Sequence, residues 1–200
     1  MARHPRSRPG LTIHLARHGQ TEWNETGRRQ GRLDSPLTEL GLRQAARNAE
    51  LLLAEGIDAV FASPLGRAQR TASIIASKLS LTVTVLDDLA EIDHGLWSGL
   101  TSAEIDAGWP GQRVVRERDK YGFRFPAGES YADGDVRAGR ALAEIERAGV
   151  RRPLAVSHEM IGRMLLRQLG VPDALESRQP SDVVYRVRTG GTVERLTCAN

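Results

Sequence analysis

The sequence predicts an α/β fold, a three-layer α/β/α sandwich with a mainly parallel central sheet. Three observations support this prediction. Short segments rich in β-branched residues alternate with longer segments of helical periodicity, which is the pattern of parallel strands joined by crossover helices. The 200 residues are enough to bury the core of one domain. Apolar residues make up 40% and charged residues 26%, as is typical of globular proteins.

Four short segments are predicted to be strands because they are apolar and rich in β-branched residues. They are residues 11–16 (LTIHLA), 58–63 (DAVFAS), 81–86 (LTVTVL) and 153–158 (PLAVSH). Near the C-terminus, VVYRVRT and TVERLT flank Gly190 and Gly191, a pattern that predicts a β-hairpin.

The first predicted helix runs from Thr38 to Glu55 and ends at Gly56. Its apolar residues fall on one face at helical spacing, and they are Leu42, Ala45, Ala49, Leu52 and Leu53. A second helix is predicted to begin at Ser63 and Pro64, as an N-cap followed by proline in the first helical position. Its predicted buried residues are Leu65, Ala68, Ala72, Ile75 and Leu79.

Two further helices are predicted in the second half of the chain. Ser130 and Asp133 have the spacing of a capping box, which predicts a helix start near Ser130. The segment 159–169 has helical character and is followed by Gly170 and Pro172, which cannot easily continue a helix.

The net charge of +3 does not predict nucleic-acid binding. The chain has 28 basic and 25 acidic residues, and Arg3, Arg6 and Arg8 account for the excess, since 28 − 3 = 25. We therefore expect residues 1–10 to be a disordered basic arm and residues 11–200 to be a single domain. Aromatic residues are only 4%, too few for the stacking that single-stranded nucleic acids favour.

The sequence also predicts a cytoplasmic protein that does not bind membranes. No apolar run approaches the roughly 18 residues that would span a bilayer, and the first residues lack the apolar stretch of a secretory signal. The one cysteine, Cys198, has no partner for an internal disulfide.

Chemically interesting residues follow the predicted strands. Arg17, His18 and Gly19 come after the first strand, Ser63 to Arg67 after the second, and His158 ends another. In open α/β sheets ligands bind beyond the carboxyl ends of the strands, so we expect these residues to meet. The long irregular stretches 20–36 and 100–130 are expected to form walls or a lid over that edge.

This set of residues suits phosphoryl transfer to a histidine. A neutral imidazole must attack phosphorus, cations must hold the equatorial oxygens, and an acid must protonate the leaving oxygen. Arginines beside His18 would lower its pKa and keep it nucleophilic, and a helix N-terminus after Ser63 would favour an anion. The set requires no metal.

Six motifs resemble those of the histidine phosphatase superfamily, which includes the phosphoglycerate mutase-like enzymes. They are LARHGQTEWN, GRRQGRLDSPLTELGLRQA, FASPLGRAQRTA, EIDHGLWSGLT, FPAGES and VSHEMIGRMLL, in this order between residue 11 and about residue 169. The resemblance implies a phosphoglycerate mutase-like fold and a small phosphorylated metabolite as substrate. It also implies that the reaction uses no metal or organic cofactor, and that a homodimer is an option.

The resemblance implies roles for individual residues. His18 would be the phosphorylated nucleophile, and Glu91 the general acid that later activates water. Five residues would bind the phosphoryl group, namely Arg17, Asn24, Gln30, Arg67 and His158. His14 is expected to be structural, whereas Arg163 is either an ion-pair partner or a ligand.

Four residues are candidates for substrate selection. Glu159 stands where many relatives have glycine, and we expect it to point away from the phosphate or to pair with an arginine. His94 either touches the leaving group or lines the lid. Arg113 and Arg116 lie in a basic run that either contacts an acidic group of the substrate or forms a solvated helix, the second being favoured.

Within the family, the sequence favours a phosphatase over a cofactor-dependent phosphoglycerate mutase. Such mutases resemble this chain less because they have a long insertion before the second histidine and an arginine–tyrosine pair after the acid. Here Glu91 is followed by Ile92, Asp93 and His94, and the interval to His158 is short. A silent phospho-ligand binding protein is the third alternative, but the loss of His18 or Glu91 that would mark it has not occurred.

Overall fold

The computed structural model describes residues 11–188 and 190–197. The basic arm at residues 1–10 and Cys198 lie outside the described residues. In the described part of the chain, no helix is long and apolar enough to cross a membrane.

A central sheet of six strands runs in the order β3-β2-β4-β1-β5-β6. The strands are β1 (Thr12–Arg17), β2 (Ala59–Ala62), β3 (Val83–Val85), β4 (Pro153–Ser157), β5 (Val184–Arg188) and β6 (Thr192–Leu196). The first four are parallel, whereas β5 pairs antiparallel with β1 and β6 antiparallel with β5. The mainly parallel sheet and the C-terminal hairpin are therefore confirmed.

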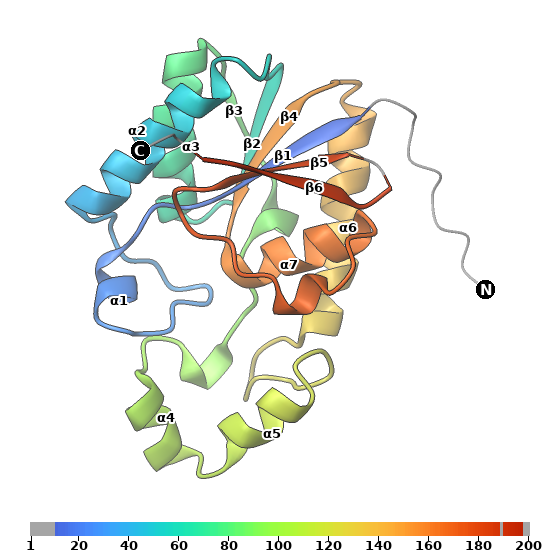
Figure 1. Ribbon diagram of the computed structural model, residues 1–200. Coiled ribbons are helices and arrows are strands. Elements are labelled where there is room, and N and C mark those ends of the chain that lie inside the picture. Colours follow the sequence, from blue (N-terminus) through green and yellow to red (C-terminus); the bar gives the residue numbers. More distant parts are fainter. Residues whose placement is uncertain (1–10, 189, 198–200) are drawn as a thin grey trace.

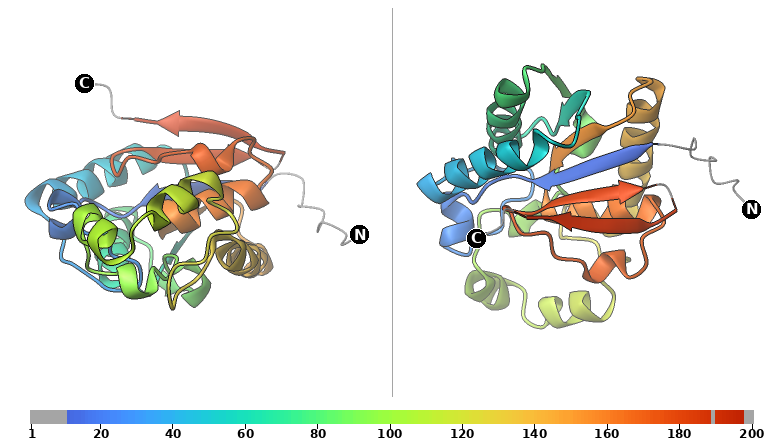
Figure 2. Two further views of the ribbon diagram at one scale, coloured as in Figure 1. Left: turned by 90° about the horizontal axis from the view of Figure 1, so that it is seen from below. Right: turned by 45° about the horizontal axis from the view of Figure 1, so that its top comes forward.

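Helices cover both faces of this sheet (Figures 1 and 2). One face packs against α2 (Glu39–Leu52) and α3 (Gly66–Leu79), the other against α6 (Tyr131–Arg147) and α7 (Glu159–Gln168). Successive strand residues point to opposite faces, so Leu15 joins the core under α6 and α7, whereas Ala16 joins the core under α2 and α3. This arrangement confirms the three-layer α/β/α sandwich.

Short elements make up the remaining connections. They are α1 (Glu22–Glu25), η1 (Asp87–Leu89), η2 (Gly95–Trp97), α4 (Ser102–Gly108), α5 (Gln112–Arg118) and η3 (Ala174–Glu176). Figure 1 shows α1, α4 and α5 together beyond one edge of the layers, in the lower part of the view. The carboxyl ends of β1 and β4 point to the same region because these strands are parallel.

Two helix boundaries differ from the sequence prediction. Helix α2 ends at Leu52, and Leu53 is 51% exposed because the chain turns away from the buried face there. Helix α3 begins at Gly66 with Leu65 as its N-cap, so the predicted start at Ser63 and Pro64 is wrong. Ser63 instead accepts a hydrogen bond from Leu65 N at 3.2 Å, in the turn that precedes the helix.

The other two helix starts are confirmed. Ser130 is the N-cap of α6, and its capping box with Asp133 is complete. Helix α7 begins directly after His158, which is its N-cap, and extends to Gln168.

Candidate active site

The register of two parallel strands brings His18 and His158 together. Arg17 at the end of β1 is paired with Ser157 at the end of β4, so each histidine is the first residue after its strand. The two imidazole ring centroids are 5.1 Å apart. The expected meeting of residues at the strand ends therefore occurs at the centre of the sheet.

His18 is buried and held in one tautomer. Its Nδ1 lies 2.8 Å from the carbonyl oxygen of Gly19, so Nδ1 carries the hydrogen and donates it. Nε2 is left with its lone pair, to which Arg67 Nε donates at 3.3 Å. Burial, and then the charges of Arg67 and Arg17, hold the pKa of His18 well below its usual value. A neutral imidazole with a free Nε2 is the form that can act as a nucleophile.

His158 is also buried, and its Nε2 lies 2.7 Å from the hydroxyl of Ser63. Burial and the nearby charge of Arg67 place its pKa well below the usual value. A neutral His158 has one N–H, which lies on Nδ1 when Ser63 donates to Nε2. No described group pairs with Nδ1.

Arg67, in the first turn of α3, is held by residues 31–34 of the loop after α1. Its Nη1 donates to Leu33 O and Asp34 Oδ1, both at 2.8 Å, and its Nη2 donates to Gly31 O at 2.9 Å. These bonds fix the guanidinium plane so that Nε faces His18. One hydrogen of Nη2 remains for an anion, and Nε–H becomes available to it once the Nε2 lone pair of His18 is used.

Arg17 pairs with Glu159. Its Nη1 lies 3.0 Å from Glu159 Oε2, while Glu159 Oε1 accepts from Arg163 Nη2 at 2.9 Å. The expectation that Glu159 pairs with an arginine is therefore confirmed. Because Arg163 also donates to Ser177 O and Tyr131 Oη, its contacts are those of a scaffold residue.

A pocket of about 150 Å³ lies in front of His18. Its lining comes from the end of β1, from α1 and the loop after it, from the start of α3, from the segment between η1 and η2 and from the start of α7. It consists of Arg17, His18, Asn24, Arg28, Arg29, Gln30, Gly31, Arg67, Glu91, His94, Glu159 and Met160. Residues 20–36 thus form one wall, whereas no lining residue comes from 100–130 in the described part of the chain. His158 is close behind His18 and does not line the pocket.

Asn24 and Gln30 bring amide groups to this wall. Asn24 Oδ1 accepts from the backbone N–H and the hydroxyl of Thr21, so its Nδ2 is the atom left to donate to a ligand. Gln30 is buried, and its Oε1 has no hydrogen-bond donor among the described residues.

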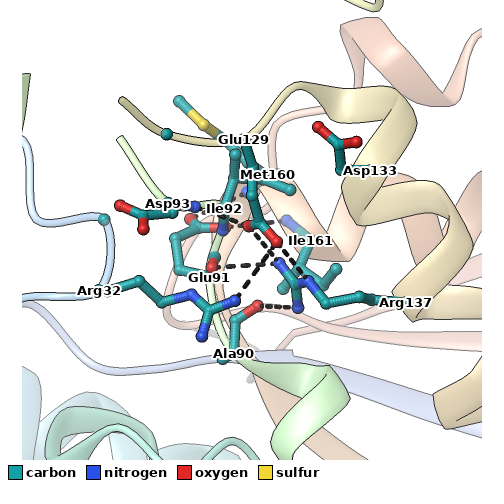
Figure 3. A network of polar contacts seen from close by, with 12 residues as sticks. Arg32, Ala90, Glu91, Ile92, Asp93, Glu129, Asp133, Arg137, Met160 and Ile161 are labelled. Atoms are coloured by element: carbon teal, nitrogen blue, oxygen red, sulfur yellow. Dashed lines mark hydrogen bonds and ion pairs between the residues drawn. The ribbon is translucent and has the colours of Figure 1, made fainter. Parts of the chain in front are cut away.

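Glu91 is fixed at the N-terminus of α7. Its Oε1 accepts from the backbone N–H groups of Ile92 and Ile161, both at 2.9 Å, and its Oε2 accepts from Met160 N at 3.1 Å. Figure 3 shows the carboxylate between these backbone groups. Because Oε2 accepts only one of these bonds, it keeps a lone pair for a proton.

Arg137 holds the backbone that carries Glu91, and sequence reasoning missed it. Its Nη1 donates to Ala90 O at 2.8 Å, its Nη2 donates to Glu91 O at 3.3 Å, and both Nε and Nη2 bind Glu129 (Figure 3). The available signal was a charged residue at an apolar-face position of α6, three residues after the buried Gly134 and four before the buried Ala141.

His94 lines the pocket wall with its ring against Phe125, at 4.6 Å between centroids. Its Nε2 lies 3.0 Å from Met160 Sδ. Burial and the charges of Arg29, Arg116 and Arg67 lower its pKa to about 3. His94 is therefore neutral at neutral pH.

The structure places Arg113 and Arg116 away from the pocket lining. Arg113 pairs with Asp106 at 2.6 Å on the surface. Arg116 is buried, donates to Tyr131 Oη at 3.0 Å and lies over the Phe125 ring. The favoured expectation of a solvated helix is therefore wrong for Arg116, whose charge packs against aromatic rings.

Two further observations concern residues outside the pocket. His14 is buried and bonded to Glu55 at 3.0 Å, as expected of a structural residue. Within residues 11–188 and 190–197, no group of three or more His, Cys, Asp or Glu side chains is arranged to hold a metal ion.

Comparisons with known proteins agree with this geometry. The family model of the histidine phosphatase superfamily (branch 1) matches residues 13–183. A protein of Yersinia pestis named "Probable phosphoglycerate mutase GpmB" is 39% identical over 173 residues, which cover 84% of this chain and 79% of that protein. The mycobacterial glucosyl-3-phosphoglycerate phosphatase has a similar structure, with a TM-score of 0.81 at 31% identity over 88% of this chain and 90% of that one. The α-ribazole phosphatase of Shigella flexneri has a TM-score of 0.82 at 26% identity, over 94% and 96% of the two chains.

Proposed function

The chain belongs to the histidine phosphatase superfamily, and we propose that it is a metal-independent phosphomonoesterase that acts on a small phosphorylated metabolite through a phosphohistidine at His18. The observation that carries this proposal is the state of His18. Its Nδ1–H is bound to Gly19 O, its pKa is lowered, and its Nε2 lone pair faces the Nε–H of Arg67.

In the first step, His18 Nε2 attacks phosphorus in line with the leaving oxygen. The N–P bond forms as the P–O bond to the alcohol breaks. Arg17, Arg67 and Asn24 Nδ2 stabilise the equatorial oxygens, while the ring of His158 packs beside that of His18. Glu91 Oε2 gives a proton to the departing oxygen, so the alcohol leaves uncharged.

In the second step, water attacks the phosphohistidine. Glu91, now a carboxylate, takes a proton from the water as its oxygen bonds to phosphorus. The N–P bond breaks, His18 recovers its lone pair, and inorganic phosphate is released. The cations that stabilise the first transition state also stabilise the second, because the same three oxygens carry the charge.

A phosphoglycerate mutase is the second candidate, and the name of the Yersinia relative favours it. A mutase must return the phosphoryl group to an acidic substrate and keep water away. Two observations support the hydrolase instead. Both solved neighbours described above are named phosphatases, and the segment after Glu91 lacks the arginine–tyrosine pair of the mutases.

One series of assays tests the proposal. We expect wild-type protein in excess EDTA to release phosphate from p-nitrophenyl phosphate and to show an acid-labile, alkali-stable phosphoryl group on a peptide containing His18. His18→Ala should lose both signals. Loss of activity in EDTA with recovery on adding a metal would contradict metal independence.

The alternatives give different results in the same series. Efficient conversion of 3-phosphoglycerate to 2-phosphoglycerate that depends on 2,3-bisphosphoglycerate, with little phosphate release, would establish the mutase. Binding of phosphorylated compounds without either reaction would establish a silent binding protein.

A further inference from the structure

Arg29 brings an unpaired positive charge to the pocket wall. It follows Arg28 in the loop after α1, and two backbone bonds fix its position, from Arg29 N to Leu100 O at 3.0 Å and from Gly99 N to Arg29 O at 2.7 Å. Its guanidinium carbon lies 6.0 Å from the centre of the Trp97 ring. Its Nε is buried and finds no hydrogen-bond acceptor among the described residues.

The other three arginines that line the pocket have acidic partners. Arg17 pairs with Glu159, Arg28 with Glu104 and Arg67 with Asp34. Arg29 has no ion pair with any described residue. Arg29 is partly buried, and leaving its buried Nε–H without an acceptor costs free energy. An unpaired arginine in the wall of a binding pocket is therefore a site that an anionic ligand would complete.

Neighbouring charges increase the preference for an anion. Burial, and then the charges of Arg116 and Arg113, lower the pKa of Arg29, and they outweigh the opposite effect of Tyr131 and Glu117. Arg116 and Arg113 are themselves partnered by Glu117 and Asp106, which leaves Arg29 as the available cation at this end of the pocket within the described residues.

Two further polar atoms of the pocket residues indicate that the ligand has a hydrogen-bonding group besides its acidic group. Gln30 Oε1 and His94 Nδ1 are buried and have no hydrogen-bond partner in the described part of the chain. Both residues line the pocket with Arg29. Gln30 Oε1 can only accept, so a hydroxyl group of the ligand fits it.

We infer that Arg29 binds a second acidic group, a carboxylate or a phosphate, on the alcohol that leaves His18, and that Gln30 accepts from a hydroxyl of the same alcohol. This inference rests on the proposed phosphatase activity. It places the substrate among phosphorylated hydroxy acids and bisphosphorylated polyols, and it assigns selection of the leaving group to Arg29. Arg113 and Arg116 were only the less favoured alternative for this role in the sequence.

Matched substrates test this role. 3-Phosphoglycerate and glycerol 3-phosphate differ by a carboxylate in place of a hydroxymethyl group, and glycerol 1,3-bisphosphate adds a second phosphate to the latter. For each acidic substrate, we take the ratio of its kcat/KM to that of glycerol 3-phosphate. The larger of the two ratios in wild-type protein tells whether the second group is a carboxylate or a phosphate.

Arg29→Met should lower that larger ratio about tenfold or more, since a charge-assisted hydrogen bond contributes roughly that factor. Arg29→Lys keeps the charge and should retain part of the preference, which also shows that the fold tolerates substitution. Arg118→Met is the matched control, because Arg118 is exposed on α5 and absent from the pocket lining. It should leave both ratios unchanged.

The outcomes separate this inference from the proposed function. If phosphate release depends on His18 but Arg29→Met leaves both ratios at their wild-type values, the inference is wrong and the phosphatase stands. A wild-type preference for glycerol 3-phosphate over both acidic substrates would overturn the inference in the same way. If His18→Ala has no effect on phosphate release, the proposed function and the inference fail together.

Discussion

Arg17 Nη1 lies 3.0 Å from Glu159 Oε2. The Glu159 carboxylate is therefore paired with an arginine that is proposed to bind the phosphoryl group. Both side chains are mostly buried, with exposed fractions of 19% and 24%. Glu159 is also the first residue of α7, where the helix N-terminus favours its negative charge. The carboxylate is thus held at the entrance of the pocket by a helix end and two arginines, Arg17 and Arg163.

Glu159→Gln should therefore tighten the binding of phosphate and vanadate. The variant removes a negative charge that repels the ligand and competes for Arg17, an effect of about 0.5–1 kcal/mol for a partly exposed pair. We expect the inhibition constants of both anions to fall about two- to fivefold. Arg163→Met is the control, because it removes a partner of Glu159 and leaves the carboxylate in place, so no tightening is expected. Weaker binding to the Gln variant would show that Glu159 aligns Arg17 for the ligand.

Arg137→Met should impair the release of poor leaving groups. Arg137 Nη1 holds Ala90 O at 2.8 Å, so its loss frees the backbone that carries Glu91. An alkyl alcohol needs a proton to leave, whereas p-nitrophenolate does not, and general acid catalysis contributes about 100-fold or more. We expect kcat to fall at least about tenfold for an alkyl phosphate and much less for p-nitrophenyl phosphate.

The control for Arg137 is Arg140→Met on the same helix, where an exposed arginine pairs with Asp88. It should change neither rate. Equal losses of kcat for both leaving groups in Arg137→Met would mean that Arg137 does not act on protonation of the leaving group. Unfolding in urea, measured in parallel, gives the stability of each variant.

The fold and the centre of the site were predictable because they depend on local patterns. Strand periodicity located the strands, and the rule that ligands bind at their carboxyl ends brought His18 and His158 together before any coordinates were known. The pairing of Glu159 with an arginine was one of two alternatives that followed from charge. These predictions rest on properties that each segment has by itself.

What was missed depends on contacts between distant segments. Ser63 has the side chain of a good N-cap, but its hydroxyl bonds to His158, 95 residues away, and α3 starts later. Arg116 lies in a strongly charged run, yet Phe125 and Tyr131 bury it. The proposed role of Arg29 follows from a missing partner, and which arginines have partners depends on contacts made in the folded protein.

Stability should fall as the solution becomes acidic, and His94 should contribute to the loss. In the folded protein its pKa is lowered to about 3, whereas in the unfolded chain it is near 6.5. Between these values the unfolded state binds a proton that the folded state does not, so the free energy of unfolding decreases as pH falls below 6.5. The slope is about 1.4 kcal/mol per pH unit for one such histidine.

His94→Gln isolates this contribution, because the other titrating groups are the same in both proteins. Urea unfolding at roughly pH 6, 5 and 4 should show a shallower pH dependence for the variant, by up to about 1.4 kcal/mol per pH unit. Identical slopes would mean that His94 takes up its proton in the folded state at an ordinary pH. His18, His158 and His14 also have lowered pKa values. They contribute the same pH dependence of stability to the wild-type protein and to the variant, so their effect cancels in the comparison.

Gly41→Ala should lower both the stability of the protein and its kcat, because Gly41 packs against the backbone that follows His18. A Cβ at Gly41 would lie 2.1 Å from the backbone oxygen of Gln20, and one at Gly19 would lie 2.3 Å from Gly41 O, so the start of α2 touches the chain just after His18. The clash must move the Gly19–Gln20 backbone, because neither atom belongs to a flexible side chain. Gly19 O is the acceptor that fixes His18 Nδ1–H at 2.8 Å, so a shift there also disturbs the orientation of Nε2. We expect a loss of about 1–3 kcal/mol in the free energy of unfolding, together with a lower kcat.

Gly108→Ala, at the end of α4 where a Cβ meets no atom within 4 Å, is the control and should be neutral or stabilising by up to about 1 kcal/mol. Urea unfolding and phosphate release measure the two effects, and a Gly41→Ala protein with wild-type stability and turnover would show that this contact does not position His18.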